Sequence, residues 1–236
     1  MDLILDTHSH TIASGHAYNT INEMARSAAD KGLKLLAITE HAPMMPGASS
    51  YMYFLNFKAL RREKYGVKLL FGVEFNILDK EGTLDLRGDA ANATDIGIAS
   101  MHQPCYKTGT AEENLYAYIK AMKNPHVNII GHPDDGRFPV DMEKLVIAAK
   151  EHHVLLELNN ASLNPKGFRK NTEENDIKML ELCKQYGQPV VIGSDAHVEE
   201  DVGNFERALN VIRKTGFPEE LVVNTSIDKL YEYLAH

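Results

Sequence analysis

Short apolar runs that end in a histidine or an acidic residue recur along the whole chain. From the N-terminus onward the runs read LILDTHSH, LLAITEH, LLFGVEF, IGIASMH, NIIGHP and VVIGSDAH. Continuous stretches of Ile, Val and Leu are typical of parallel strands that are buried on both faces. Because the carboxyl ends of such strands lie on one side of a parallel barrel, the pattern predicts that these polar side chains meet at one rim.

Strand-like runs alternate with helix-like segments from end to end. The predicted strands are Leu3–Leu5, Leu35–Ile38, Lys68–Val73, Asp95–Ala99, Val127–Ile130, Val154–Leu158 and Pro189–Ile192. The predicted helices are Thr20–Lys31, Met52–Tyr65, Ala111–Met122, Asp141–His152, Glu173–Tyr186, Phe205–Lys214 and Ile227–Leu234. This alternation favours right-handed βαβ units and a parallel α/β sheet or barrel. No linker or low-complexity tract divides residues 1–236, so we expect a single domain.

Composition argues against several classes of protein. The net charge of −8, from 25 basic and 33 acidic residues, argues against a dedicated nucleic-acid surface, which is normally basic. The start, MDLILDTHSH, has no basic segment before its short apolar run and does not resemble a signal peptide, and no run is long enough to span a bilayer. We therefore expect a cytoplasmic protein in which Cys105 and Cys183 are reduced thiols. Whether the protein forms a homo-oligomer stays open.

Two pairs of polar residues have the spacing i, i+2 at a strand end. His8 and His10 follow the first strand, and since strand side chains alternate between faces, both imidazoles point the same way and can bind one ion. Asp195 and His197 repeat the spacing after the last predicted strand, where Gly193 permits a tight turn. One His-x-His pair can equally lie on a polar surface, and it is the recurrence at six strand ends that favours metal binding.

The remaining candidate ligands stand alone in the sequence. His41, His102 and His132 each follow a separate strand, and His16 lies shortly after the first pair. Any one of them is more often a hydrogen-bonded histidine than a ligand, but together they favour coordination. Glu74 is the most informative, because a glutamate after LLFGV would lie near the barrel axis, where an unpaired carboxylate is costly. It would either bridge two cations or form a buried ion pair.

Nine such ligands are more than one ion can use, so the sequence predicts a multinuclear metallohydrolase. The other four histidines do not follow a strand end and are not predicted to be ligands: His126, His152, His153 and His236.

The motifs DTHSH, TEH, GVE, SMH, GHP and GSDAH resemble, in order and spacing, those of the PHP (polymerase and histidinol phosphatase) superfamily, specifically its trinuclear-zinc phosphatase branch. The resemblance covers essentially the whole chain, including the NNAS and closing NTS segments. It implies a distorted, TIM-like (β/α)7 barrel with the metal site at its C-terminal rim. The ligands it implies are His8, His10, Glu74 and Asp195 for one ion, His16, His41 and His197 for a second, and Glu74, His102 and His132 for a third.

The same resemblance implies hydrolysis of a small phosphomonoester. A hydroxide held between the first and second ions would attack phosphorus, since coordination lowers the pKa of water to about 7. The three divalent ions would most readily be zinc, with manganese or iron as alternatives, and their charge would attract an anionic substrate despite the acidic surface. Candidate substrate-binding residues in the loops are Arg137, Asn160, Lys166, Arg169 and Lys170. For each cation among them, an exposed solvated charge is the alternative.

Three other functions remain as alternatives. A barrel amidohydrolase also opens with His-x-His and ends with Asp, but typically bridges its metals with a carboxylated lysine, where this chain offers Glu74. A 3′–5′ exonuclease of the PHP type would need a basic stripe for the phosphate backbone. A non-catalytic, metal-dependent sensor would be expected to have a closed, cysteine-rich site, which a nearly cysteine-free cluster does not resemble.

Overall fold

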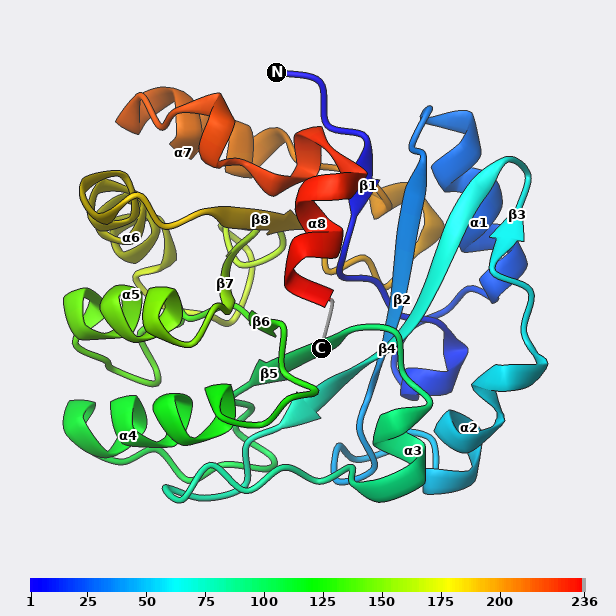
Figure 1. Cartoon of the computed structure of the whole chain (residues 1–236), viewed down its shortest axis with the longest axis horizontal. Helices are drawn as coiled ribbons and strands as arrows, with labels where there is room; N and C mark the ends of the chain where they lie inside the picture. Colours follow the sequence, from blue (N-terminus) through cyan, green and yellow to red (C-terminus); the bar gives the residue numbers. More distant parts are fainter. Residues whose placement is uncertain (235–236) are drawn as a thin grey trace.

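A ring of parallel strands forms the centre of the computed structural model, which describes residues 1–234 (Figure 1). The parallel strands are β1 (Leu5–Asp6), β2 (Leu35–His41), β4 (Val67–Asn76), β5 (Gly97–Ser100), β6 (Ile129–Ile130), β7 (Leu155–Asn159) and β8 (Val190–Gly193). They hydrogen-bond in the order β1-β2-β4-β5-β6-β7-β8. All seven overlap the predicted strands. His236, which the sequence places outside the site, lies beyond the described residues.

The first and last strands meet and nearly close the ring. At the C-terminal end, the backbone N–H of His10 donates to the carbonyl of Ala196 over 2.8 Å, and that of Asp195 donates to the carbonyl of His8 over 2.9 Å. At the other end the buried side chain of Asn224 fills the gap. Its Oδ1 accepts from the Ile192 backbone N–H over 2.7 Å, and its Nδ2 donates to the Leu5 carbonyl over 3.0 Å. The prediction of a distorted (β/α)7 barrel is confirmed.

Helices surround the strands (Figure 1). They are α1 (Ile21–Asp30), α2 (Tyr51–Leu55), α3 (Gly88–Asn92), α4 (Ala111–Met122), α5 (Met142–Glu151), α6 (Thr172–Tyr186), α7 (Glu206–Thr215) and α8 (Ile227–Leu234). Leu230 and Tyr233 of α8 are buried against Leu5, Leu35 and Ile129, near the beginnings of their strands. Helix α8 thus covers the N-terminal end of the barrel, which leaves the other end for polar groups. Within residues 1–234, none of the helices has the length and apolar character needed to cross a membrane.

The predicted helix Met52–Tyr65 is wrong over its second half. Helix α2 ends at Leu55, a 3₁₀ turn follows over Asn56–Ala59, and Glu63–Lys64 forms a short strand, β3, antiparallel to β4. The reason is the turn at Tyr65 and Gly66, whose φ angles of 52° and 78° lie in the left-handed region and reverse the chain. Helix α3 was not predicted, because five residues are too few to show a helical period.

We expect Asn224→Ala to lower the free energy of unfolding by about 3 kcal/mol, because it leaves buried backbone groups of both β1 and β8 without partners. Urea unfolding followed by circular dichroism, at one fixed metal concentration, measures this. Asn22→Ala, at an exposed position of α1, is the matched control and should change stability by less than about 0.5 kcal/mol. Equal effects of the two substitutions would contradict a role for Asn224 in closing the barrel.

Candidate metal centre

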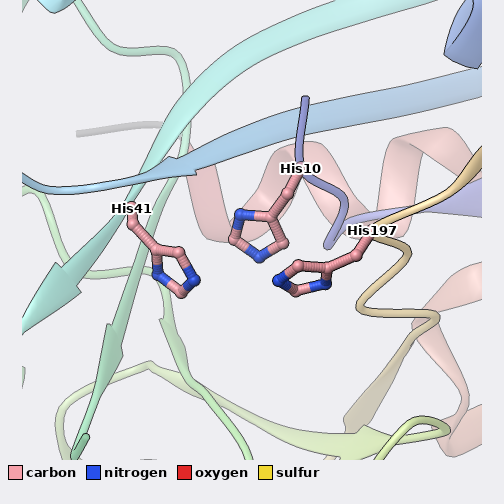
Figure 2. A group of neighbouring side chains, drawn as sticks. All are labelled: His10, His41 and His197. Carbon is pink, nitrogen blue, oxygen red and sulfur yellow. The ribbon is translucent and has the colours of Figure 1, made fainter. Parts of the chain in front are cut away.

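All nine predicted ligands come together at the C-terminal rim of the barrel. Three overlapping groups have ligand atoms within 4.8 Å of one another, and they are His8, His10 and Glu74; His41, Glu74 and His102; and His10, His41 and His197. Figure 2 shows the last group, in which three separate segments direct their rings into one space. His16 joins it, with its ring 4.8 Å from that of His41 and 4.9 Å from that of His197.

The carboxylate of Glu74 lies in the middle of the ligands. The parallel register of β2 and β4 sets Glu74 opposite His41, and Oε2 of Glu74 lies 2.7 Å from Nδ1 of His41. The same oxygen is 3.5 Å from Nε2 of both His8 and His10. The Nε2 atom of His10 is also 3.3 Å from Oδ1 of Asp195, so a second carboxylate faces the same space.

The other oxygen of Glu74 faces a different pair of imidazoles. Oε1 lies 3.2 Å from Nε2 of His102 and 3.0 Å from Nε2 of His132. One carboxylate therefore has a separate set of ring nitrogens at each of its oxygens, which is the arrangement needed to bridge two cations.

The donor atoms fit divalent metal ions. Nδ1 of His41 and Oε2 of Glu74 are buried, and neither has a hydrogen-bond partner among the described residues, because their close contact lacks hydrogen-bond geometry. A buried carboxylate oxygen without a donor is costly, and a cation beside it removes that cost. Imidazole nitrogens with carboxylate oxygens suit Zn and Fe, and extend to Mn.

The pKa shifts of several ligands also favour cations, whereas burial at His8 is outweighed by Glu157, Asp195 and Glu74, which raise the pKa of that imidazole. Burial by itself raises the pKa of Glu74, but the neighbouring His102 and His41 outweigh it and hold the pKa well below its usual range. Burial and the neighbouring His41 lower the pKa of His10 well below its usual range, and the same two causes lower that of His16 to about 4. Ionised carboxylates and neutral imidazoles are the forms that bind metal.

Glu157 of β7 also belongs to the site, although the strand-end pattern does not predict it. Its side chain is fully buried and lies 2.7 Å from Nδ1 of His8. It also accepts from the His132 backbone N–H over 2.8 Å and from Nδ2 of Asn159 over 3.1 Å. A carboxylate on one ring nitrogen orients the other toward a metal. The signal in the sequence was a single glutamate inside the apolar run VLLELN.

Two further ligands are held by polar residues behind them. Nδ1 of His10 lies 3.0 Å from Oγ of Ser14, which donates to the buried Glu40 over 2.6 Å. Nδ1 of His102 lies 2.8 Å from Oδ1 of Asn76. Because Nδ2 of Asn76 donates to Asp85 over 2.7 Å, its Oδ1 must accept, so Nδ1 of His102 carries the proton and Nε2 is left free for a metal.

Gly193 is required for close packing and not, as predicted, for a tight turn. It lies in β8 and has no left-handed φ angle. A Cβ atom there would lie 2.0 Å from Oε1 of Glu157 and 2.8 Å from Cβ of His8. Left-handed φ angles occur instead at His132 (32°) and Asp195 (54°), where the backbone turns to direct a ligand inward.

A pocket of about 760 Å³ opens over the ligands. Arg137 and Arg169, two of the predicted substrate-binding residues, line it. Lys166 and Lys170 are exposed and do not. The amide oxygen of Asn160 caps α7 instead, accepting backbone N–H groups of Arg207 and Ala208 over 3.0 and 3.1 Å.

Arg169 and Arg137 differ in what they already bind. Arg169 is largely buried, and its Nη2 lies 3.1 Å from Oδ2 of Asp195. Its Nη1 donates to Asn159 and Ser162 over 3.1 and 2.9 Å, while its Nε has no hydrogen-bond partner among the described residues. The guanidinium of Arg137 is held by Asp135, with Nη2 and Oδ2 2.6 Å apart, and by Gln103.

Comparison with known proteins places the chain among the phosphatases. A family model described as the PHP domain matches residues 6–233. A probable phosphatase of Thermoanaerobacter sp. (strain X514) is 49% identical over 235 residues, which cover 99% of this chain and 95% of the relative. A probable phosphatase of Clostridium novyi (strain NT) is 44% identical over 234 residues, with 99% and 95% covered. The predicted enzyme class, a metal-dependent phosphatase, is confirmed.

The fold is also similar to that of solved structures. One is a histidinol phosphate phosphatase from Lactococcus lactis subsp. lactis Il1403, complexed with zinc, L-histidinol and phosphate. It has a TM-score of 0.64 and 21% sequence identity, and the match covers 91% of this chain and 94% of that one. At this identity the likeness shows a shared barrel. With the family model spanning nearly the whole sequence, the chain belongs to the PHP domain family.

Proposed function

We propose that the protein hydrolyses a small phosphomonoester at a trinuclear metal centre, with zinc as the expected metal and manganese or iron as alternatives. The observation that carries the proposal is the carboxylate of Glu74, whose two oxygens face separate sets of imidazoles. The three overlapping ligand groups support three ions. The zinc in the L. lactis phosphatase of similar fold supports that metal here.

Different residues would bind the metal ions and orient the ligands. Divalent cations bound here would supply a hydroxide nucleophile near neutral pH and neutralise charge on the phosphoryl oxygens. Glu157, Ser14 and Asn76 hold the ligand imidazoles in fixed orientations, which limits reorganisation during the reaction. The pocket has room for one small molecule above the ligands.

Arg169 is the best candidate among the predicted residues for a direct contact with the phosphoryl group. It lies beside the predicted ligand Asp195, and the N–H of its buried Nε has no partner in the part of the chain that the structure describes. Guanidinium groups bind phosphate through paired donors. Nη1 and Nη2 of Arg169 already contact Asn159, Ser162 and Asp195, so a phosphoryl group would displace one of these partners or pair with Nε. Arg137 is less suited, because Asp135 and Gln103 contact all three of its guanidinium nitrogens.

The alternatives are less well supported. A pocket of about 760 Å³ suits a small molecule better than a polymer, and the net charge of −8 offers little attraction for the nucleic acid of a 3′–5′ exonuclease. The names of the relatives favour phosphate esters over the amides of an amidohydrolase. A non-catalytic sensor would bind metal without turnover.

Metal removal tests the proposal first. We expect the purified, zinc-supplemented protein to contain three metal equivalents per chain, one for each ligand group. It should hydrolyse p-nitrophenyl phosphate, lose this activity on chelation and regain it with Zn²⁺ or Mn²⁺. Plasma emission spectroscopy and a colorimetric assay measure the two quantities. One equivalent or fewer without turnover would refute the trinuclear phosphatase and favour the sensor.

Glu157→Gln should weaken zinc binding tenfold to a hundredfold, because the neutral amide no longer fixes the ring of His8 through a charge-assisted hydrogen bond. Competition with a chromophoric chelator measures the affinity. Glu143→Gln is the matched control. Glu143 is exposed and accepts a hydrogen bond from Tyr186 over 2.6 Å, so the zinc affinity of this variant protein should equal that of the wild type. An unaltered affinity in the Glu157 variant would exclude a role in holding His8.

Arg169→Met should lower kcat/KM for p-nitrophenyl phosphate about a hundredfold, since it removes the donors nearest the phosphoryl group. Inhibition by inorganic phosphate should weaken as well, while the metal content stays at its wild-type value. Lys166→Met, an exposed cation of the same loop, serves as the control and should leave kcat/KM within about twofold. Loss of metal in the Arg169 variant would instead assign that residue to support of Asp195.

A further inference from the structure

The pocket has apolar walls above its polar floor. The ligand residues form the floor, whereas Met45, Pro46, Pro104, Ala161 and Phe168 line the walls. They come from the loops that follow β2, β5 and β7, which in a parallel barrel are the segments that contact the substrate. A phosphoryl group on the floor would therefore direct the rest of its ester between apolar surfaces.

The polar side chains of the walls are largely occupied by one another. Nε of Arg137 donates to both carboxylate oxygens of Asp135 over 3.0 and 2.9 Å, and Nη1 donates to Gln103 over 2.7 Å. Oγ of Ser162 accepts from Arg169 over 2.9 Å and donates to Asp134 over 3.2 Å. A leaving group rich in hydroxyls would find few free partners here, and unpaired buried polar groups cost binding energy.

Phe168 offers a flat surface at the mouth of the pocket. Its side chain is 71% exposed although it lines the pocket. The guanidinium carbon of Arg137 lies 4.6 Å from the centre of the ring, and that of Arg169 lies 5.7 Å from it. Because Arg137 is itself held by Asp135 and Gln103, this contact holds the ring at the entrance. An aromatic group bound over the floor could stack on it.

We propose that the substrate is a phosphomonoester with a flat, mainly apolar leaving group, an aromatic alcohol, and that Phe168 is a specificity-determining residue. This inference rests on the proposed phosphatase activity. Phe168 recognises the leaving group and takes no part in bond breaking. Water adds to phosphorus, the P–O bond to the leaving group breaks, and the alcohol departs with one proton while inorganic phosphate remains.

Three esters with alkyl oxygen leaving groups test the proposal without a large difference in intrinsic reactivity. They are benzyl phosphate, which is flat; cyclohexylmethyl phosphate, which is apolar but not flat; and glycerol 3-phosphate, which is hydroxylated. We expect kcat/KM for benzyl phosphate to exceed that for glycerol 3-phosphate about tenfold or more, with the cyclohexylmethyl ester between them. Phosphate release by the zinc-loaded enzyme measures all three.

Variants at Phe168 test whether this residue causes the preference for benzyl phosphate. Phe168→Ala should lower the ratio of kcat/KM for benzyl phosphate over glycerol 3-phosphate about tenfold, and Phe168→Trp should retain it. Binding of the inert analogue benzylphosphonate, measured by calorimetry, should weaken in the alanine variant to a similar degree. Tyr116→Ala is the matched control, because Tyr116 is exposed and lies beside a cation, with Nζ of Lys120 5.0 Å from its ring, but does not line the pocket.

The outcomes separate this inference from the proposed function. Faster hydrolysis of glycerol 3-phosphate, equal rates for all three esters, or an unchanged ratio in Phe168→Ala would overturn the substrate class and leave the phosphatase intact. Failure of the metal-loaded enzyme to hydrolyse any of the three esters and p-nitrophenyl phosphate would overturn both. A selectivity that falls equally in Phe168→Ala and Tyr116→Ala would remove the role of Phe168.

Discussion

The buried carboxylate of Glu74 is the constraint on which the rest of the structure depends. An ionised carboxyl group at the end of a barrel axis, out of contact with water, is too costly to keep unless positive charge surrounds it. Here ring nitrogens approach both of its oxygens, and within residues 1–234 one of these oxygens has no hydrogen-bond donor. Cations would therefore complete the cluster, and the folded barrel holds the ligand side chains in positions that could bind them.

That frame reaches well beyond the ligands themselves. Glu157 joins β7 to His8 and to the backbone of His132, so the orientation of two ligands depends on one strand. It can lie there because Gly193 on the neighbouring strand has no side chain to occupy the space. Left-handed backbone angles at His132 and Asp195 add a local cost, which the surrounding packing has to offset. Stability and metal binding are thus coupled through the same few residues.

The sequence indicated which side chains converge at the rim but not which residues support them, for a physical reason. Ligands recur at the ends of parallel strands, and that repetition separates them from ordinary histidines such as His152. Supporting residues have no such period: Glu157 is one glutamate in a strand, and Asn160 looked like a substrate contact but caps a helix that begins 46 residues later. The hairpin at Gly66 was likewise hidden, because its first strand, β3, has only two residues and shows no strand period.

The floor and the walls of the pocket have different structural requirements, so substitutions are tolerated more easily in the walls than in the floor. The floor must hold charges at fixed distances, so its residues come from strand ends and from groups hydrogen-bonded behind them. The walls must only match a leaving group, so they come from loops, where a substitution such as one at Phe168 disturbs no strand pairing. A chain with a net charge of −8 can attract an anion only through local positive charge, supplied by Arg169 and the cations that the ligands require. The chemistry is consequently fixed by the barrel, and the choice of substrate by its loops.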